Sequence, residues 1–135
     1  GADVIVGFPG EDEKAFEESY TLIDALGFTY LHVFPFSPRP GTIAANLPGR
    51  PDDQSIRRRA SRLRELSRNK RQAFAVSRIG DVEEVLVTGS CGGRFSGVSS
   101  SYLMVEAAGH ADTGDLVPIR LSGIEEHTLR GETIE

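Results

Sequence analysis

The chain has 135 residues, of which 39% are hydrophobic and 26% charged, and its formal net charge is -5. These values are typical of one folded domain or two small ones, and they exclude a largely disordered chain. A membrane-spanning helix is excluded because no run of about 18 apolar residues is present, and the single cysteine excludes an internal disulfide, so that a reducing cytoplasm is the expected location.

The N-terminal part of the sequence predicts a strand, a helix and a second, parallel strand. A short apolar strand over residues 3–6 runs into the turn Gly7-Phe8-Pro9-Gly10, and Asp12 is a suitable N-cap for a helix that ends near Gly27. Residues 28–36 (FTYLHVFPF) are apolar on both alternating faces, as expected of a strand that is covered on both sides. We expect a βαβ unit whose neighbouring strands lie upstream of Gly1.

The middle of the chain predicts a proline-rich loop followed by a basic helix. Proline recurs through residues 37–51, and a helix can begin at Asp52 or Asp53. Residues 50–78 carry ten basic and three acidic side chains, whereas residues 1–49 have a net charge of -5 and residues 79–135 of -7. Two interpretations remain open for these arginines: contacts to RNA phosphates, or a solvated face that neutralises the acidic segments around it.

From Gly80 onward the hydrophobic pattern has a period of two. Five short strands are expected, over residues 82–88, 94–98, 102–107, 116–121 and 126–130. Nine of the fifteen glycines fall between Gly80 and Gly131, which favours a small antiparallel barrel with tight corners. A domain boundary is therefore predicted near residues 76–80.

Residues typical of catalytic or metal sites are scarce. The three histidines lie far apart in the sequence, and Cys91 has no base beside it, so no catalytic and no metal-binding residue is predicted. The two loops that follow the first two strands, VGFPGE and FSPRPGT, are the informative features. Both follow parallel strands and should therefore face one pocket, the alternative being that they are only rigid turns.

The segments DVIVGFPGE and FEESYTLIDALGFTYLHVFPFSPRPGT, followed by a basic helix and a glycine-rich β domain, resemble the C-terminal part of the radical S-adenosylmethionine methylthiotransferases. The fold class that this resemblance implies is α/β: the last strands and helices of a partial (β/α) barrel over residues 1–77, then a small antiparallel β-barrel of the TRAM type, similar to an OB-fold, over residues 78–135. HVFPFSPRPGT most resembles the branch that acts on threonylcarbamoyladenosine in tRNA, and the isopentenyladenosine branch and the ribosomal-protein branch rank second and third.

The resemblance also implies roles for particular residues. The strand-end turn would line the S-adenosylmethionine pocket, and it comprises Val6, Gly7, Phe8, Pro9, Gly10 and Glu11. The second loop would border the substrate opening, and it comprises Phe36, Ser37, Pro38, Arg39, Pro40 and Gly41. The predicted RNA contacts are the helix residues Arg57, Arg58 and Arg62 and the β-domain residues Arg94, Phe95 and Tyr102. For Phe95 and Tyr102 the alternative is a place in the barrel core.

The function implied is the addition of a methylthio group to C2 of a modified adenosine next to the anticodon of tRNA. The family uses S-adenosylmethionine and [4Fe-4S] clusters, but its C-x3-C-x2-C motif is absent here, so the fragment is expected to hold neither and to be inactive alone. The expected partners are tRNA and the missing N-terminal and cluster-binding domains. Two alternatives stay open: a ribosomal-protein aspartate methylthiotransferase, and a non-enzymatic module that binds RNA or protein.

Overall fold

The computed structural model describes residues 1–134 of the chain. They form two compact units, one over residues 1–71 and one from residue 72 onward. The boundary between the units falls inside the long helix α2 (Asp53–Ser77). Each unit has its own hydrophobic core, and each is described by itself below.

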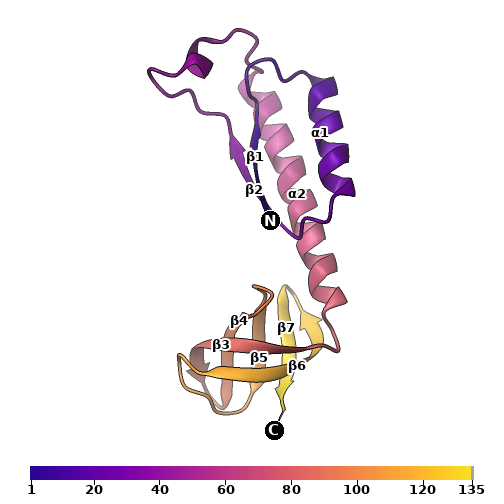
Figure 1. Cartoon of the computed structure of the whole chain (residues 1–135), viewed down its shortest axis with the longest axis vertical. Coiled ribbons are helices and arrows are strands. Elements are labelled where there is room, and N and C mark those ends of the chain that lie inside the picture. The colour runs from indigo at the N-terminus through magenta and orange to yellow at the C-terminus, as the bar shows by residue number, and fades with distance from the viewer. Residues whose placement is uncertain (135) are drawn as a thin grey trace. The chain divides into compact units, whose positions relative to one another are not determined.

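The first unit is built around a pair of parallel strands. Strand β1 (Ala2–Val6) pairs with β2 (Leu31–Pro35) in a register that places Ala2 opposite Leu31 and Val6 opposite Pro35. Helix α1 (Glu13–Ala25) connects them (Figure 1). The side chain of Asp12 caps α1 by accepting a hydrogen bond from the Ala15 amide at 2.8 Å. The predicted βαβ unit is therefore present.

The two helices pack on one face of this strand pair. Val6 and Val33 share a core with Phe16 of α1 and with the buried stripe of α2, which comprises Ile56, Ala60, Leu63 and Leu66. On the opposite face, Ile5 is 57% and Phe34 is 50% exposed. The sequence predicted that residues 28–36 are covered on both sides; in the described chain β2 is covered on one side only.

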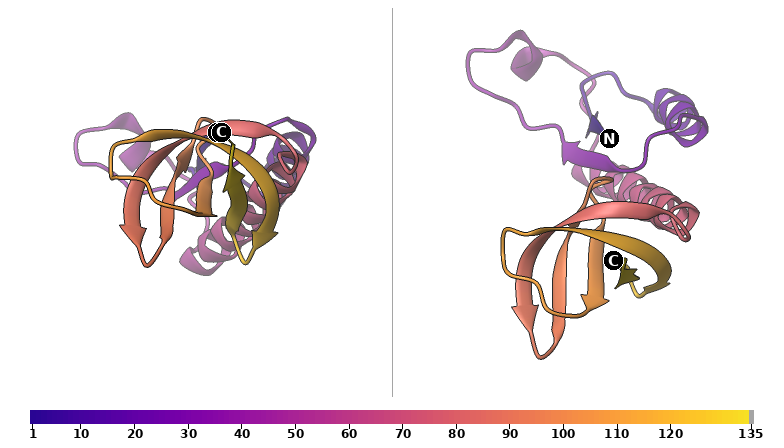
Figure 2. Two further views of the ribbon diagram at one scale, coloured as in Figure 1. Left: turned by 90° about the horizontal axis from the view of Figure 1, so that it is seen from below. Right: turned by 60° about the horizontal axis from the view of Figure 1, so that its bottom comes forward.

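The second unit is a closed barrel of five strands. These are β3 (Val82–Cys91), β4 (Arg94–Ser99), β5 (Met104–Ala108), β6 (Leu116–Glu125) and β7 (Thr128–Thr133), arranged in the order β3-β4-β5-β7-β6 with β6 pairing back onto β3. Figure 2 shows the strands wrapping around a common interior. That interior is filled by a core that includes Val85, Phe95, Val105, Ile119 and Leu129.

One pair of barrel strands departs from the predicted antiparallel arrangement. Strands β5 and β7 run parallel, with Val105 opposite Leu129, while the other four pairs are antiparallel. Strand direction cannot alternate all the way around a closed ring with an odd number of members. A five-stranded barrel must therefore contain a parallel pair, and the sheet is mixed.

Among residues 1–134, no helix is both long enough and apolar enough to cross a membrane.

Candidate functional site

The turn after β1 and the loop after β2 leave the sheet at the same edge. Val6 lies opposite Pro35 at the end of the parallel pair, and the Phe36 amide donates a 2.7 Å hydrogen bond to the Val6 carbonyl. Just beyond, the rings of Phe8 and Phe36 meet edge to face with centroids 5.3 Å apart. The two segments that the sequence singled out therefore lie side by side, at the edge where α/β sheets bind ligands.

The turn after β1 is closed by hydrogen bonds within the chain. The Gly7 amide donates to Glu11 Oε1, the Glu11 amide to the Phe8 carbonyl, and the Gly10 amide to the Gly49 carbonyl, each at 2.9 Å. Gly7 and Gly10 have φ values of +81° and +91°, which favour glycine. These three amides of the turn already have partners within the chain, so a ligand would meet the glycine backbone rather than these N–H groups.

The loop after β2 is exposed over its proline-rich part. Residues 37–41 are all exposed, and the Arg39 carbonyl accepts a 2.8 Å hydrogen bond from Thr42 Oγ1, which begins the short 3-10 helix η1 (Ile43–Asn46). Ile43 is 84% exposed. The guanidinium of Arg39 is thus carried on an exposed segment at the same edge as the turn, where it is accessible to an anionic group.

A buried arginine that sequence reasoning missed holds the turn in place. Arg59 of α2 is only 4% exposed, and its Nη1 donates to the Glu11 carbonyl at 2.9 Å and to Glu11 Oε1 at 2.8 Å, while Nη2 donates to Glu13 Oε2 at 3.0 Å. Burial alone would lower the pKa of Arg59, but the hydrogen bonds to Glu13 and Glu11 outweigh it and raise the pKa above its usual value. Arg59 therefore links α2 to the end of the turn at Glu11 and to the first residue of α1, Glu13.

A sequence signal for Arg59 did exist. It lies three residues after Ile56 and four before Leu63, so helical spacing places it on the apolar stripe of α2 rather than on the solvent side. A charged residue in that position needs a partner of opposite charge, and the acidic sequence Glu11-Asp12-Glu13 offers one. Arg59 was missed because α2 contains many arginines, and its position on the apolar stripe was not distinguished from theirs.

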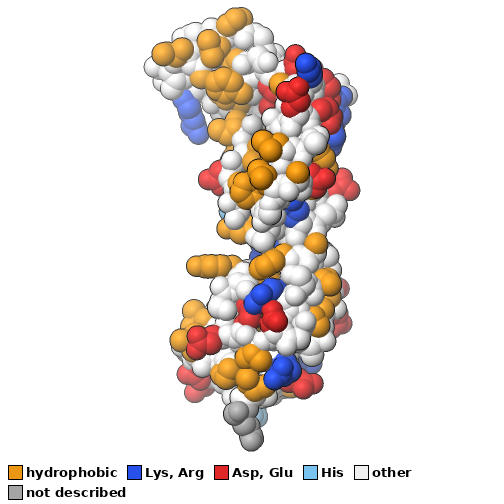
Figure 3. Space-filling model, turned by 45° about the vertical axis from the view of Figure 1, so that its right-hand side comes forward, with side chains coloured by type: hydrophobic (Ala, Val, Ile, Leu, Met, Phe, Trp, Pro, Cys, Tyr) orange, Lys and Arg blue, Asp and Glu red, His pale blue; other side chains and the backbone are white. Residues whose placement is uncertain are grey.

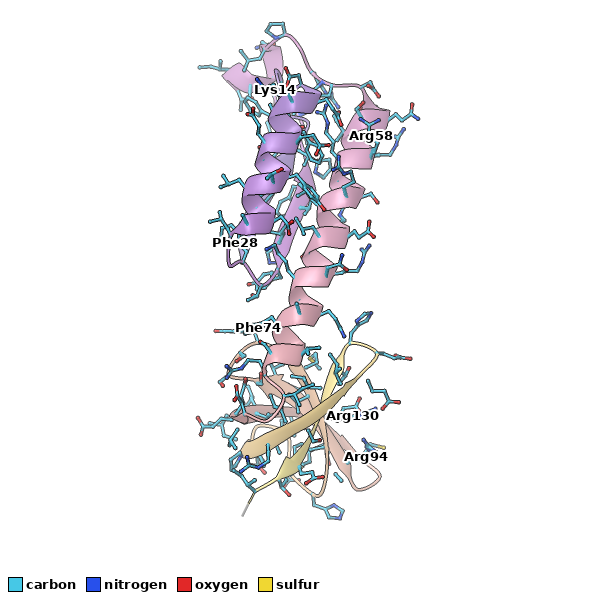
Figure 4. All side chains as sticks on the ribbon, turned by 90° about the vertical axis from the view of Figure 1, so that its right-hand side faces the viewer. Lys14, Phe28, Arg58, Phe74, Arg94 and Arg130 are labelled. Atoms are coloured by element: carbon cyan, nitrogen blue, oxygen red, sulfur yellow. The ribbon has the colours of Figure 1, made fainter. Side chains whose placement is uncertain are left out.

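The three α2 arginines predicted to contact RNA differ in their surroundings. Arg57 is exposed, whereas Arg58 pairs with Glu13 at 3.0 Å. Arg62 forms a two-point ion pair with Glu17 and lies over the Tyr20 ring, 4.7 Å from its centroid. The hydrogen bond from Arg62 is the main reason that the pKa of Glu17 is lowered. Two of the three thus already contact acidic side chains of α1; Figure 4 labels Arg58 on α2.

The three β-domain residues predicted to contact RNA also differ. Phe95 lies in the barrel core and is 3% exposed, so its ring is not accessible for stacking on a base. Tyr102 is 79% exposed and has a φ of +61°. Arg94 lies 3.9 Å from Glu106, which also pairs with Arg130, a residue that the sequence did not single out (Figure 4). RNA contact by Arg94 and Tyr102 stays a prediction, whereas stacking by Phe95 is wrong because its ring is buried.

The residues described in the structure offer no metal centre. No group of three or more His, Cys, Asp or Glu side chains within residues 1–134 is arranged to hold a metal ion, and Cys91 is an exposed free thiol.

Comparison with known proteins gives a consistent set of relatives. No family model matches the chain. It is 40% identical over 135 residues to the tRNA-2-methylthio-N(6)-dimethylallyladenosine synthase of Nitrosomonas europaea, and 36% identical over 137 residues to that of Alkalilimnicola ehrlichii. It is also 36% identical over 134 residues to the threonylcarbamoyladenosine tRNA methylthiotransferase of Chlamydia pneumoniae. These matches cover 97%, 98% and 98% of the chain, but only 30%, 31% and 32% of the relatives, so the chain spans about a third of their length.

Proposed function

We propose that this chain, which is homologous over nearly its whole length to the tRNA methylthiotransferases, is the C-terminal part of such an enzyme. The observation that carries the proposal is the similarity at up to 40% identity over 97% of the chain. Within that match, VGFPGE and SPRPGT meet at one sheet edge, as a shared ligand site requires.

The first part of the proposal concerns the domains. Residues 1–77 would be the last part of a radical S-adenosylmethionine (β/α) barrel, and residues 78–135 a TRAM-like barrel. The parallel β1–β2 pair supports the former, because both helices cover one face, as the outer helices of such a barrel do, while Ile5 and Phe34 leave an apolar surface on the other face. That face would point into the barrel interior once further strands pair with the edges of β1 and β2. The closed five-stranded barrel supports the latter.

The cofactor part of the proposal divides into two. The turn over residues 6–11 fits a nucleoside cofactor such as S-adenosylmethionine, because its glycines let a ligand approach the backbone closely and Arg59 fixes its shape. When bound, S-adenosylmethionine would supply the radical and the methyl group. An iron-sulfur cluster does not fit this chain, since one cysteine cannot provide the three or four thiolates that a [4Fe-4S] cluster takes.

The substrate part of the proposal is tRNA, acted on at an adenosine next to the anticodon in the cytoplasm. Residues 36–41 would border the opening through which the nucleotide enters, with the exposed Arg39 placed to meet a phosphate. The N-terminal and cluster-binding portions of the same enzyme would perform the bond-breaking chemistry. This chain would bind and orient the cofactor and the tRNA, and it would be inactive without those portions.

The experiment that tests the proposal is a chimera. The homologous third of the Nitrosomonas europaea relative is replaced by these 135 residues, and the chimera is expressed in a strain that lacks its own enzyme. Mass spectrometry of tRNA nucleosides should then detect the methylthio-dimethylallyl nucleoside. Arg39→Ala in the chimera should lower its yield, whereas Lys14→Ala, at a side chain that is 84% exposed on α1, should not. A folded chimera that leaves the tRNA unmodified would contradict the proposal.

The branch of the family is a separate question. The sequence favoured threonylcarbamoyladenosine as the substrate, which the Chlamydia pneumoniae relative supports at 36% identity, while the dimethylallyladenosine relative reaches 40%. Deleting the gene in its host and measuring both methylthio nucleosides decides between them, because only the true product should disappear. If both persist and a ribosomal-protein modification is lost instead, the ribosomal alternative replaces both.

A further inference from the structure

A row of apolar side chains crosses the outside of the barrel over four adjacent strands. Leu116 of β6 lies directly opposite Leu86 of β3, Leu86 opposite Val98 of β4, and Val98 opposite Met104 of β5. Residues directly opposite each other on one face have Cβ atoms about 4.5–5.5 Å apart, so these four form a continuous surface, which we name the apolar row. Leu116, Leu86 and Met104 are 64%, 45% and 42% exposed.

The apolar row faces outward because side chains alternate between the inside and the outside of the barrel along each strand. On β3, the outward Leu86 alternates with the inward Val85 and Val87, which are at most 1% exposed. On β5, the outward Met104 precedes the buried Val105. A closed barrel cannot turn these side chains inward without shifting its register by one residue, so the row is a fixed property of the outer surface.

One side of the apolar row is walled by an ordered loop. Leu86, Val98 and Leu116 line a cavity of about 270 Å3 together with Glu84, Ser99, Ser100 and Tyr102. The Ser100 amide donates to the Glu84 carbonyl at 2.9 Å, and the Tyr102 amide donates to the Ser99 carbonyl at 2.8 Å. The same loop is held from inside the barrel, where the buried Glu83 accepts hydrogen bonds from the Ser101 amide and hydroxyl. The groove is therefore preformed.

The rim of the groove is acidic. Glu84 lies two positions from Leu86 along β3, and Asp115 directly precedes Leu116, with Oδ2 of Asp115 accepting a hydrogen bond from the Asp112 amide. Both carboxylates lie on exposed residues. The basic residue nearest to the row along β6 is Arg120, four positions beyond Leu116 and about 13 Å along the strand. Arg120 lies opposite Val82, so it is closer to Glu84 than to the apolar row.

We propose that the apolar row and its acidic rim dock a protein segment that presents apolar side chains next to lysines or arginines. A contiguous exposed apolar surface on a closed domain is typical of a docking site, and carboxylates on its rim favour a cationic partner. RNA fits the surface poorly, because its phosphates would meet Glu84 and Asp115 rather than arginines. Figure 3 shows apolar, acidic and basic side chains interspersed on the face of the molecule that it draws. The inference concerns an interaction that the proposed tRNA chemistry does not require.

The test uses the whole 135-residue chain and a synthetic 14-residue helical peptide of leucine and lysine as the probe. Titration followed by NMR should shift the amide signals of the apolar row, and Leu86→Ser should weaken binding at least fivefold. Val82→Ser is the matched control, because Val82 is 44% exposed on the same strand but lies four positions away; it should change the affinity less than twofold. Met104→Ser provides a second variant should Leu86→Ser perturb the fold.

Charge is tested separately. Glu84→Gln should weaken binding of the leucine–lysine peptide, whereas Glu126→Gln, at the β6–β7 turn, should not. A leucine–glutamate peptide of equal length should bind at least tenfold more weakly. The proposal is overturned if the peptide shifts signals elsewhere on the barrel, if Leu86→Ser binds as the parent does, or if an RNA stem-loop shifts the apolar row more strongly than the peptide. Self-association through the row, abolished by Leu86→Ser in sedimentation experiments, would also overturn it in favour of a homodimer.

Discussion

Glu83 is an acidic residue enclosed by the barrel, and its surroundings make its charge stabilising. Burial alone would raise its pKa, but hydrogen bonds from Ser99, Arg78 and Ser101 outweigh this effect and lower the pKa from 4.5 to about 2. Arg78 Nε donates to Glu83 Oε1 at 2.8 Å. The ionised carboxylate therefore joins the segment that precedes β3 to the loop between β4 and β5.

The lowered pKa predicts how barrel stability depends on pH. A carboxyl group whose pKa is lower in the folded state contributes its full stabilisation above about pH 4.5, and loses it as the pH falls toward 2. Glu83→Gln should lower the free energy of unfolding by about 3 kcal/mol at pH 7 and flatten this dependence. Urea unfolding followed by NMR signals of barrel residues measures both. A variant that keeps the parent's pH dependence between pH 5 and 2 would show that another group causes it.

Gly7 and Gly10 provide a matched pair of substitutions in the turn after β1. Both have positive φ, so alanine should cost about 1–2 kcal/mol of backbone strain at either position. At Gly7 the added Cβ would also clash with Cγ1 of the buried Ile56, whereas at Gly10 no atom lies within 4 Å. Gly7→Ala should therefore destabilise the first unit by about 1–3 kcal/mol more than Gly10→Ala in denaturant unfolding. Equal losses would mean that Ile56 moves aside freely.

At the scale of elements, Arg59 is the connection between α2 and the turn. Its two terminal nitrogens make three hydrogen bonds to Glu11 and Glu13, a pattern that a lysine ammonium on a flexible stem cannot reproduce from the same position. Its Nε is buried without a hydrogen-bond partner in the described part of the chain. The orientation of the turn thus depends on a helix that begins more than 40 residues later.

Arg59→Lys should destabilise the first unit by about 2 kcal/mol and shift the amide signals of Gly7 and Glu11, because the turn loses its anchor. Arg57→Lys, on the same helix but exposed, should change stability by less than about 0.5 kcal/mol and leave those signals in place. Denaturant unfolding and NMR spectra of both variants are the measurements. Unchanged Gly7 and Glu11 signals in Arg59→Lys would show that the turn holds its shape without the guanidinium.

The elements that could be predicted from the sequence are those with local causes. Both long helices could be predicted from their N-caps, Asp12 and Asp52, and from the helical spacing of their apolar residues. All five barrel strands could be predicted from the alternation of apolar and polar residues. The parallel β5–β7 pair could not be predicted in this way, because it follows from closure of the whole ring. The burial of Arg59 was not predicted, because its partners Glu11 and Glu13 lie more than 40 residues away in the sequence.

At the scale of the whole molecule, the separation of charge along the chain is partly cancelled in the structure. Arg58 and Arg62 of the basic helix pair with Glu13 and Glu17 of α1, and Arg130 of the barrel pairs with Glu106. The paired arginines therefore fit the interpretation of the basic helix as a face that neutralises acidic side chains. The exposed Arg57 fits the prediction that the helix contacts RNA.

Titration of the chain with tRNA at several salt concentrations tests this division. Arg57→Gln should reduce the slope of log affinity against log salt by about 1, because one phosphate contact is lost. Arg62→Gln should reduce it less, since its charge is already neutralised by Glu17. Filter binding or fluorescence anisotropy gives the slopes. An affinity that does not respond to salt would argue against any docking of arginines on phosphates.

The strand order of the barrel has a consequence for its biosynthesis. The last of its strands to be made, β7, occupies the place between β5 and β6, so the ring stays open until residues 128–133 have left the ribosome. Until then the nascent chain carries two unpaired strand edges, the kind of surface on which polypeptides aggregate. A premature stop codon just before this strand would therefore yield an open, aggregation-prone sheet rather than a slightly shorter barrel.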